Sequence, residues 1–196
     1  MKVVLAAFLV LSSPVIAQIN SGDYGELKIA FSPNNRIVTG YYENYSGHDE
    51  ATLKPKFSCI FYFIGQLASS KAVISSYYPL DTTKIIGMFE LADSNGVQIK
   101  FPKEHGGCWN VQHFADGPVE FKLQQKMSWI EIRYATKDRV HFHSGPPSSS
   151  TQSDFIMKGD IVYVSKIIDQ WAYCTYYGIK ETTGWLRLSD LNELDY

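Results

Sequence analysis

The sequence has no cluster of basic residues. Its 18 lysines and arginines are set against 20 aspartates and glutamates, and both signs are interspersed along the chain. A nucleic-acid-binding surface needs grouped lysines and arginines, because these displace counterions from the phosphates. We therefore expect no nucleic acid among the partners of this chain.

Long apolar runs and helical periodicity are missing after residue 17. No segment there approaches the roughly 20 apolar residues that a membrane-spanning helix requires, so we expect a chain that is not membrane-spanning. Apolar residues also do not recur at helical spacing over three turns. The chain has instead 13 tyrosines, 11 phenylalanines and 14 glycines, with many short alternating runs. This composition indicates an all-β protein.

The first 17 residues are the exception to this pattern. Lys2 precedes an apolar run from Val3 to Leu11, and Val15 and Ala17 stand where signal peptidase requires small residues. This order is typical of a secretory signal peptide that is cleaved after Ala17. The apolar run itself is too short to cross a bilayer. We therefore expect a periplasmic or secreted protein.

Residues 18–135 alternate between strand-like runs and turns. The hairpin signal Asn95-Gly96 separates two of these runs, and Pro33-Asn34 separates two others. About eight strands, in an order that lets neighbours pair, predict an antiparallel meander barrel or sandwich. We expect the strands at residues 24–31, 36–45, 57–67, 72–78, 85–91, 97–101, 119–123 and 128–134.

Two glycine-aromatic segments in this part resemble avidin- or lipocalin-type barrels. They are Gly22-Asp23-Tyr24-Gly25 and the returning run Val38-Thr39-Gly40-Tyr41-Tyr42-Glu43. The resemblance implies a small-molecule carrier whose ligand lies inside the N-terminal barrel. We keep this function as an alternative.

The last third of the chain resembles the bacterial SH3-like (SH3b) domain. A Lys158-Gly159-Asp160 turn leads into an alternating strand, a second strand runs from Trp171 to Tyr177, and Thr183-Gly184-Trp185-Leu186 precedes a terminal Ser189-Asp190-Leu191. The resemblance implies a small antiparallel barrel over residues 136–196. It also implies a bacterial source, and a peptide, a cell-wall fragment or a protein partner as ligand.

The same resemblance bears on the three cysteines. Cys174 stands where the SH3-like pattern has an aliphatic core residue, so we expect it to be buried and unpaired. Cys59 and Cys108 are then left to form a disulfide, which an exported location favours. The alternative is that all three cysteines are reduced.

The segment His105-Gly106-Gly107-Cys108-Trp109 is the one candidate for nucleophilic catalysis. It resembles the nucleophile segment of papain-like proteases, in which an imidazole activates the thiolate. The residues that follow do not sustain a helix, and the Asp-Cys-Ser segment of cell-wall cysteine peptidases is missing. We therefore interpret Cys108 as a half-cystine and expect no catalytic residue. A cell-wall hydrolase, a cysteine-dependent peptidase or amidase, is the alternative.

Two further groups contain residue types that bind metals or catalyse hydrolysis in other proteins. His141 and His143 share a strand face, as zinc ligands often do, but no third ligand follows at a recognisable spacing. Glu43, Asp49 and Glu50 form an acidic patch, which we interpret as solvated because glycosidase work needs a defined carboxylate separation. We expect neither a metal nor another cofactor.

The strongest binding candidates are Trp171, Tyr173 and Tyr177. They alternate with Ala172 and Cys174, so they face outward if Cys174 faces the core. Neighbouring exposed aromatics on a sheet indicate a contact surface. The alternative is that they pack against the N-terminal domain. We predict a non-catalytic binding protein.

Overall fold

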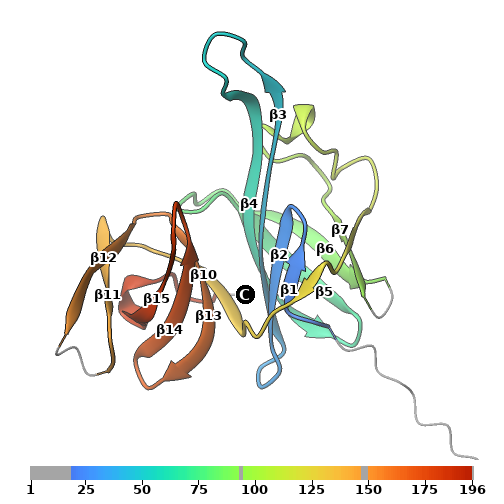
Figure 1. Ribbon diagram of the computed structural model, residues 1–196. Helices are drawn as coiled ribbons and strands as arrows, with labels where there is room; N and C mark the ends of the chain where they lie inside the picture. Colours follow the sequence, from blue (N-terminus) through green and yellow to red (C-terminus); the bar gives the residue numbers. More distant parts are fainter. Residues whose placement is uncertain (1–18, 93–94, 147–149, 196) are drawn as a thin grey trace, which may run out of the picture.

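The structure is a computed structural model that describes residues 19–92, 95–146 and 150–195. The predicted signal peptide, residues 1–17, lies outside the described residues. Within them, no helix is long and apolar enough to cross a membrane. Strands form two antiparallel sheets, so the all-β prediction is confirmed (Figure 1).

The first sheet is a nine-stranded meander with the order β8-β7-β6-β5-β4-β3-β2-β1-β9. Most consecutive strands pair because short connections join them, as the sequence predicts, whereas β7 and β8 pair across the longer segment 101–118. The strands are β1 (Gly22–Tyr24), β2 (Leu27–Ser32), β3 (Ile37–His48), β4 (Pro55–Ala68), β5 (Lys71–Tyr77), β6 (Ile85–Leu91), β7 (Gly96–Lys100), β8 (Val119–Lys122) and β9 (Gln125–Lys126).

One continuous segment joins the two ends of this sheet. β8 pairs with β7, and β9, only two residues further along, pairs with β1. Between them, the Leu123 N–H donates to the Asn95 carbonyl and the Gln124 N–H to the Asp23 carbonyl, both at 2.8 Å. The sheet therefore curls into a partly closed barrel, in which the continuous segment 119–126 reaches from β7 at one end of the sheet to β1 at the other.

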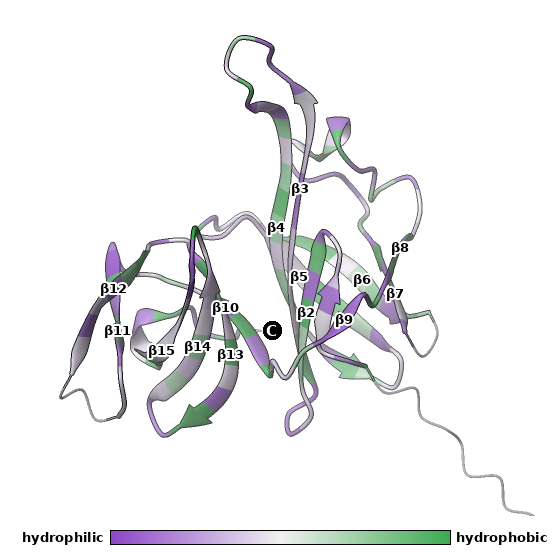
Figure 2. Cartoon of the chain, in the orientation of Figure 1, coloured by the Kyte–Doolittle hydropathy of each residue, from purple (hydrophilic) through white to green (hydrophobic). Residues whose placement is uncertain are grey.

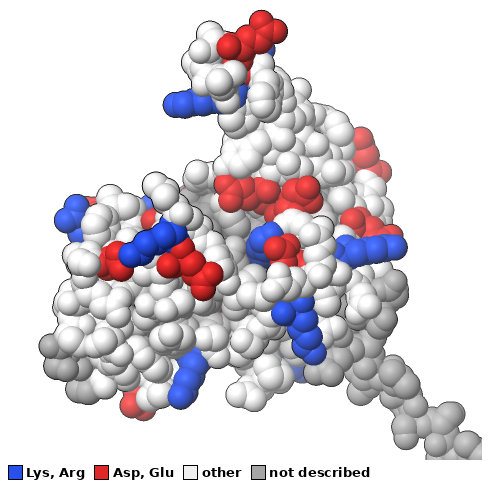
Figure 3. Space-filling model, in the orientation of Figure 1, with Lys and Arg blue, Asp and Glu red and all other residues white. Residues whose placement is uncertain are grey.

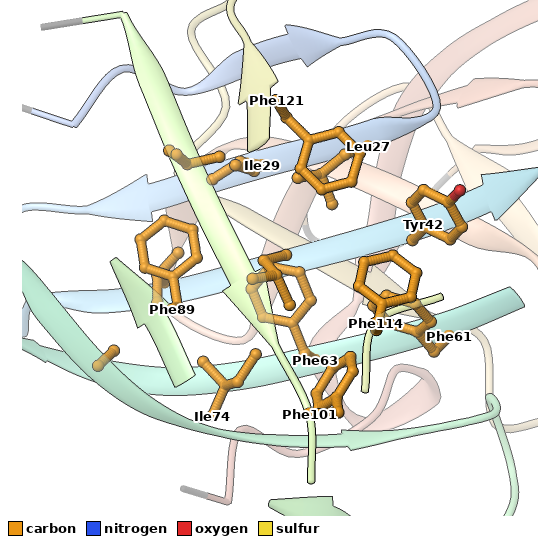
Figure 4. Packing of buried hydrophobic residues seen from close by; sticks show 14 of the residues in the cluster. Leu27, Ile29, Tyr42, Phe61, Phe63, Ile74, Phe89, Phe101, Phe114 and Phe121 are labelled. Atoms are coloured by element: carbon orange, nitrogen blue, oxygen red, sulfur yellow. The ribbon is translucent and has the colours of Figure 1, made fainter. Parts of the chain in front are cut away.

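The barrel interior is filled with aromatic side chains. Figure 4 shows rings from several strands pointing into the same space. The Phe61 ring lies 5.0 Å from Tyr42, 5.2 Å from Phe101 and 5.1 Å from Phe114, measured between centroids. Further rings come from Phe63, Phe89 and Phe121.

The middle of strand β4, residues 59–65, is buried on both faces, which explains its nearly continuous apolar sequence (Figure 2). Phe61 and Phe63 point into the barrel, while Tyr62 and Ile64 point out of it into a second cluster of buried residues. Strands that are covered on both sides lose the alternation of polar and apolar residues.

The second sheet has six strands in the order β10-β13-β14-β15-β11-β12. Its own core includes Val140, Phe142, Val164, Cys174 and Leu186. The strands are β10 (Glu131–Tyr134), β11 (Arg139–His143), β12 (Thr151–Met157), β13 (Ile161–Ile168), β14 (Trp171–Tyr177) and β15 (Glu181–Arg187). Two short 3₁₀ helices, Cys108–Asn110 and Leu188–Asp190, complete the regular structure.

Strand β10 hydrogen-bonds within the second sheet, where Ile132 lies opposite Tyr163 of β13. The sequence predicts this strand as the last of the N-terminal domain, because the expected division follows Ala135. The run is strand-like in sequence, but local sequence does not specify the partner with which a strand pairs.

The two sheets share a buried interface. Its members include Tyr62, Tyr77, Trp129, Ile132 and Tyr134. The Tyr62 hydroxyl donates to the Ile132 carbonyl at 3.1 Å, and the Ile132 N–H donates to the Thr39 hydroxyl at 2.7 Å. Because these buried polar groups form hydrogen bonds with each other across the interface, the two domains are held in one arrangement.

Candidate ligand-binding cleft

The structure separates the three aromatic residues that the sequence singles out on β14. Ala172 and Cys174 are fully buried in the second core, so Trp171, Tyr173 and Tyr177 lie on the opposite strand face, as the alternation predicts. They do not, however, form one surface.

Trp171 is covered by its neighbours. Only 8% of the residue is exposed. The Arg187 guanidinium lies 5.1 Å from the centroid of its ring, and the His143 imidazole packs edge-on at 5.0 Å. Tyr173 is half-buried and packs against Trp185 at 5.4 Å. Neither residue belongs to the buried cluster between the two sheets.

Tyr177 lies where the two domains meet and is 45% exposed. Its ring centroid is 5.2 Å from Tyr163 of β13 and 6.2 Å from Trp129, which lies on the connection between β9 and β10. Trp129 and Tyr163 are closer still, at 4.3 Å. Tyr163 faces outward because its neighbours Val162 and Val164 fill the second core. The three rings form what we call the aromatic wall.

The aromatic wall forms one side of a cleft of about 500 Å³ between the two domains. This volume is within the roughly 300–1,000 Å³ that is usual for ligand pockets. Both domains contribute to it, since Gln125 and Met127 complete the lining from the N-terminal side.

Four charged residues line the rest of the cleft: Asp23, Lys28, Glu43 and Glu181. Asp23 and Lys28 are paired across β1 and β2 and form an ion pair of 2.8 Å. Glu43 accepts a hydrogen bond from the Tyr45 hydroxyl. Neither Glu43 nor Glu181 has a cationic partner within the described part of the chain. Figure 3 shows acidic side chains gathered where the domains meet.

The phenol groups of the wall are proton donors at neutral pH. Burial raises the pKa of Tyr163 far above its usual value, and the charges of Glu43, Tyr177 and Asp23 raise it further. Burial also raises the pKa of Tyr177, and Glu181 adds to this. The cleft therefore combines aromatic faces, protonated phenols and carboxylates.

Sequence reasoning identified only part of this site. The sequence predicts Tyr177 as a binding residue, and it places Glu43 in an acidic patch with Asp49 and Glu50. Trp129 and Asp23 were not found, because they lie far from Tyr177 in sequence and become neighbours only when the domains dock. The one available signal was that Trp129 is a large aromatic beside the predicted domain division.

Cys108 is not a nucleophile in this structure. It forms a disulfide with Cys59, the pairing that the sequence predicts, and Cys174 is unpaired and buried. Gly107 is required beside it, because its φ is +85° and a Cβ there would lie 2.1 Å from the Ser58 carbonyl oxygen. The disulfide attaches the long segment after β7 to strand β4.

A buried serine–histidine pair joins this segment to strand β5. The Ser76 hydroxyl is 2.8 Å from Nε2 of His105. Burial, together with Lys103, lowers the pKa of His105 to about 4, so the imidazole is neutral at physiological pH. Such a distance suits a nucleophile and its base, but Ser76 has no exposed surface. We interpret the pair as structural.

The remaining histidines do not form a metal centre. His143 packs on Trp171, and Nδ1 of His141 lies 3.4 Å from the Gln152 carbonyl. Across residues 19–92, 95–146 and 150–195, no three histidine, cysteine, aspartate or glutamate side chains are grouped to hold a metal ion.

Comparisons with protein-family models, with curated proteins and with solved structures found no match. Function is therefore inferred from the residues of the chain and from their geometry.

Proposed function

We propose that this chain is an exported, non-catalytic binding protein whose ligand lies in the cleft between the two domains. The observation that carries the proposal is the aromatic wall of Trp129, Tyr163 and Tyr177, which faces carboxylates of the other domain across a cavity of about 500 Å³. Aromatic rings and a few polar groups around one concave site are typical of ligand binding.

The rigid interface supports this proposal. Trp129 and Tyr163 belong both to the cleft and to the buried cluster between the domains. Their orientation is therefore set before a ligand arrives, which lowers the entropic cost of binding.

The class of ligand is proposed from the resemblance of the C-terminal third to bacterial SH3-like modules. The proposed ligand is a peptide or a cell-wall fragment, which the protein binds in the periplasm or outside the cell. The disulfide is compatible with such an oxidising location. Of the residues expected to bind, Tyr177 is assigned to the cleft.

The two alternative functions have less support. A lipocalin-like carrier needs space inside the N-terminal barrel, and that interior is filled by Phe61, Phe63 and their aromatic neighbours. A cysteine hydrolase needs a thiolate, and Cys108 is in a disulfide.

Two experiments test the proposal. One is co-sedimentation of the protein with purified bacterial sacculi, and the other is selection of binding peptides from a random library. We expect at least one of the two ligands to bind the protein. Tyr177→Ala should weaken this binding by roughly tenfold or more, whereas Tyr173→Ala, on the same strand face but outside the cleft, should retain it. Failure of both ligands to bind, or equal binding by Tyr177→Ala, would overturn the proposal.

A further inference from the structure

The charges of the cleft favour a cation. Asp23, Glu43 and Glu181 are set against one cation, Lys28. The Lys28 ammonium is already held by the Asp23 carboxylate and by the Gly25 carbonyl. Glu43 and Glu181 therefore remain as acceptors for a positive group from outside, and they would repel an anion.

The aromatic wall faces the same space. A cation within roughly 6 Å of the centroid of a tryptophan or tyrosine ring is attracted by the π-electrons. The Tyr177 ring is 45% exposed and offers the accessible face, while Trp129 and Tyr163, at 6% and 7%, pack behind it with centroids 6.2 and 5.2 Å away. An organic cation suits this wall better than a metal ion, because it is weakly hydrated and its alkyl chain packs on the rings.

The Tyr163 hydroxyl adds a polar group to the same cleft. The residue is 7% exposed and lines the cleft together with Glu43 and Asp23. Burial and the charges of these two carboxylates raise the pKa of the phenol, so it stays protonated at neutral pH. A phenol oxygen can accept a hydrogen bond as well as donate one, so it can accept a bond from a cationic ligand beside the carboxylates.

We propose that the cleft binds a protonated primary amine at the end of an alkyl chain, with the ammonium group between Glu43 and Glu181 and the chain on the aromatic wall. A primary ammonium has three N–H donors, enough for both carboxylates and the oxygen of Tyr163. A quaternary ammonium has none and would leave these acceptors unsatisfied. The inference rests on the proposed binding function and specifies its ligand.

Three sources present this chemistry: a lysine side chain in a peptide, the free amine of a cell-wall diamino acid, and a free diamine. Isothermal titration calorimetry with a capped Gly-Lys-Gly peptide, with soluble cell-wall peptides and with cadaverine compares them. The matched control ligand is the same tripeptide acetylated on the lysine amine, which removes the charge and keeps the chain. We expect acetylation to weaken binding by about tenfold or more.

The variants test the two carboxylates. Glu43→Gln and Glu181→Gln keep the shape of each side chain, and together they should weaken binding of the best amine ligand by about tenfold or more. Glu120→Gln, on the exposed side of β8 and outside the cleft, should leave it unchanged.

The outcomes separate the inference from the proposed function. Tyr177-dependent binding of sacculi or selected peptides, combined with equal affinity for free and acetylated lysine, would overturn the amine and leave the binding function standing. If the protein binds neither sacculi nor selected peptides and also shows no preference for the free amine, the proposed function and the amine ligand are both overturned. Stronger binding of tetramethylammonium than of cadaverine would also contradict the primary amine.

Discussion

Trp129 and Tyr163 pack against each other in a tilted arrangement with their ring centroids 4.3 Å apart, although one lies on the connection between the domains and the other on β13 of the second sheet. The contact depends on β10, which follows Trp129 and pairs with β13, the strand of Tyr163. The pairing of β10 with β13 therefore positions the wall of the cleft.

The two outward-facing ends of β14 should respond differently to truncation. Trp171→Ala should destabilise the fold by roughly 3–5 kcal/mol, because the indole is buried under Arg187 and His143. Tyr177→Ala should cost much less stability and weaken ligand binding by roughly 1–4 kcal/mol. Urea unfolding and binding measurements on both variants provide the check. A stability loss confined to Tyr177→Ala would contradict the burial described above.

The interface between the domains should unfold together with them. Thr39→Val leaves the N–H of Ile132 buried without a partner, which should cost roughly 1–3 kcal/mol. Because the domains share this core, fluorescence and circular dichroism should still report one common transition. Ser75→Ala on the outer face of β5 is a control of similar size, since its hydroxyl has no partner in the described structure. Two separate transitions in the unchanged protein would show independent domains.

Loss of the disulfide should be costly. Cys59 and Cys108 are 49 residues apart, and closing a loop of that length stabilises by about 4 kcal/mol on the chain-entropy model. Cys59→Ser combined with Cys108→Ser should lower the free energy of unfolding by roughly 2–5 kcal/mol. Non-reducing peptide mapping of the unchanged protein should find Cys59 linked to Cys108 and Cys174 as a free thiol. A bridge that involves Cys174 would contradict the pairing.

Stability should fall in mild acid through His105. Its folded pKa is about 4, lowered mainly by burial, whereas the unfolded imidazole titrates at its ordinary value of about 6.5. Between these values the unfolded state binds the extra proton, so this contribution is complete above pH 6.5 and is lost as the pH falls toward 4. The loss is on the order of 1–3 kcal/mol.

His105→Gln isolates this effect, because glutamine still hydrogen-bonds Ser76 but does not titrate. The difference in unfolding free energy between pH 7 and pH 4.5 should be smaller in the variant than in the unchanged protein. An identical difference in both would show that His105 is not the responsive group.

The sequence was sufficient for features that depend on local pattern. Alternation along β14 predicted that Cys174 and Tyr177 lie on opposite faces, with Cys174 inward as the SH3-like resemblance implies, and the Asn95-Gly96 signal predicted the β6–β7 hairpin. Features that depend on docking were not predictable. Tyr62 and Ile64 read as ordinary core residues, and nothing local to them reveals that they face a second domain. The cleft combines residues of seven strands, β1, β2, β3, β9, β13, β14 and β15, and no motif links them.

The four tryptophans allow a direct test of the cleft. Their indole N–H signals can be followed by nuclear magnetic resonance while soluble cell-wall peptides are added. Trp129 lies in the cleft, whereas Trp109, Trp171 and Trp185 lie outside it. We predict that the signal of Trp129 shifts and saturates while the other three stay in place. A saturating shift of Trp109 or Trp185 with Trp129 unmoved would contradict the account.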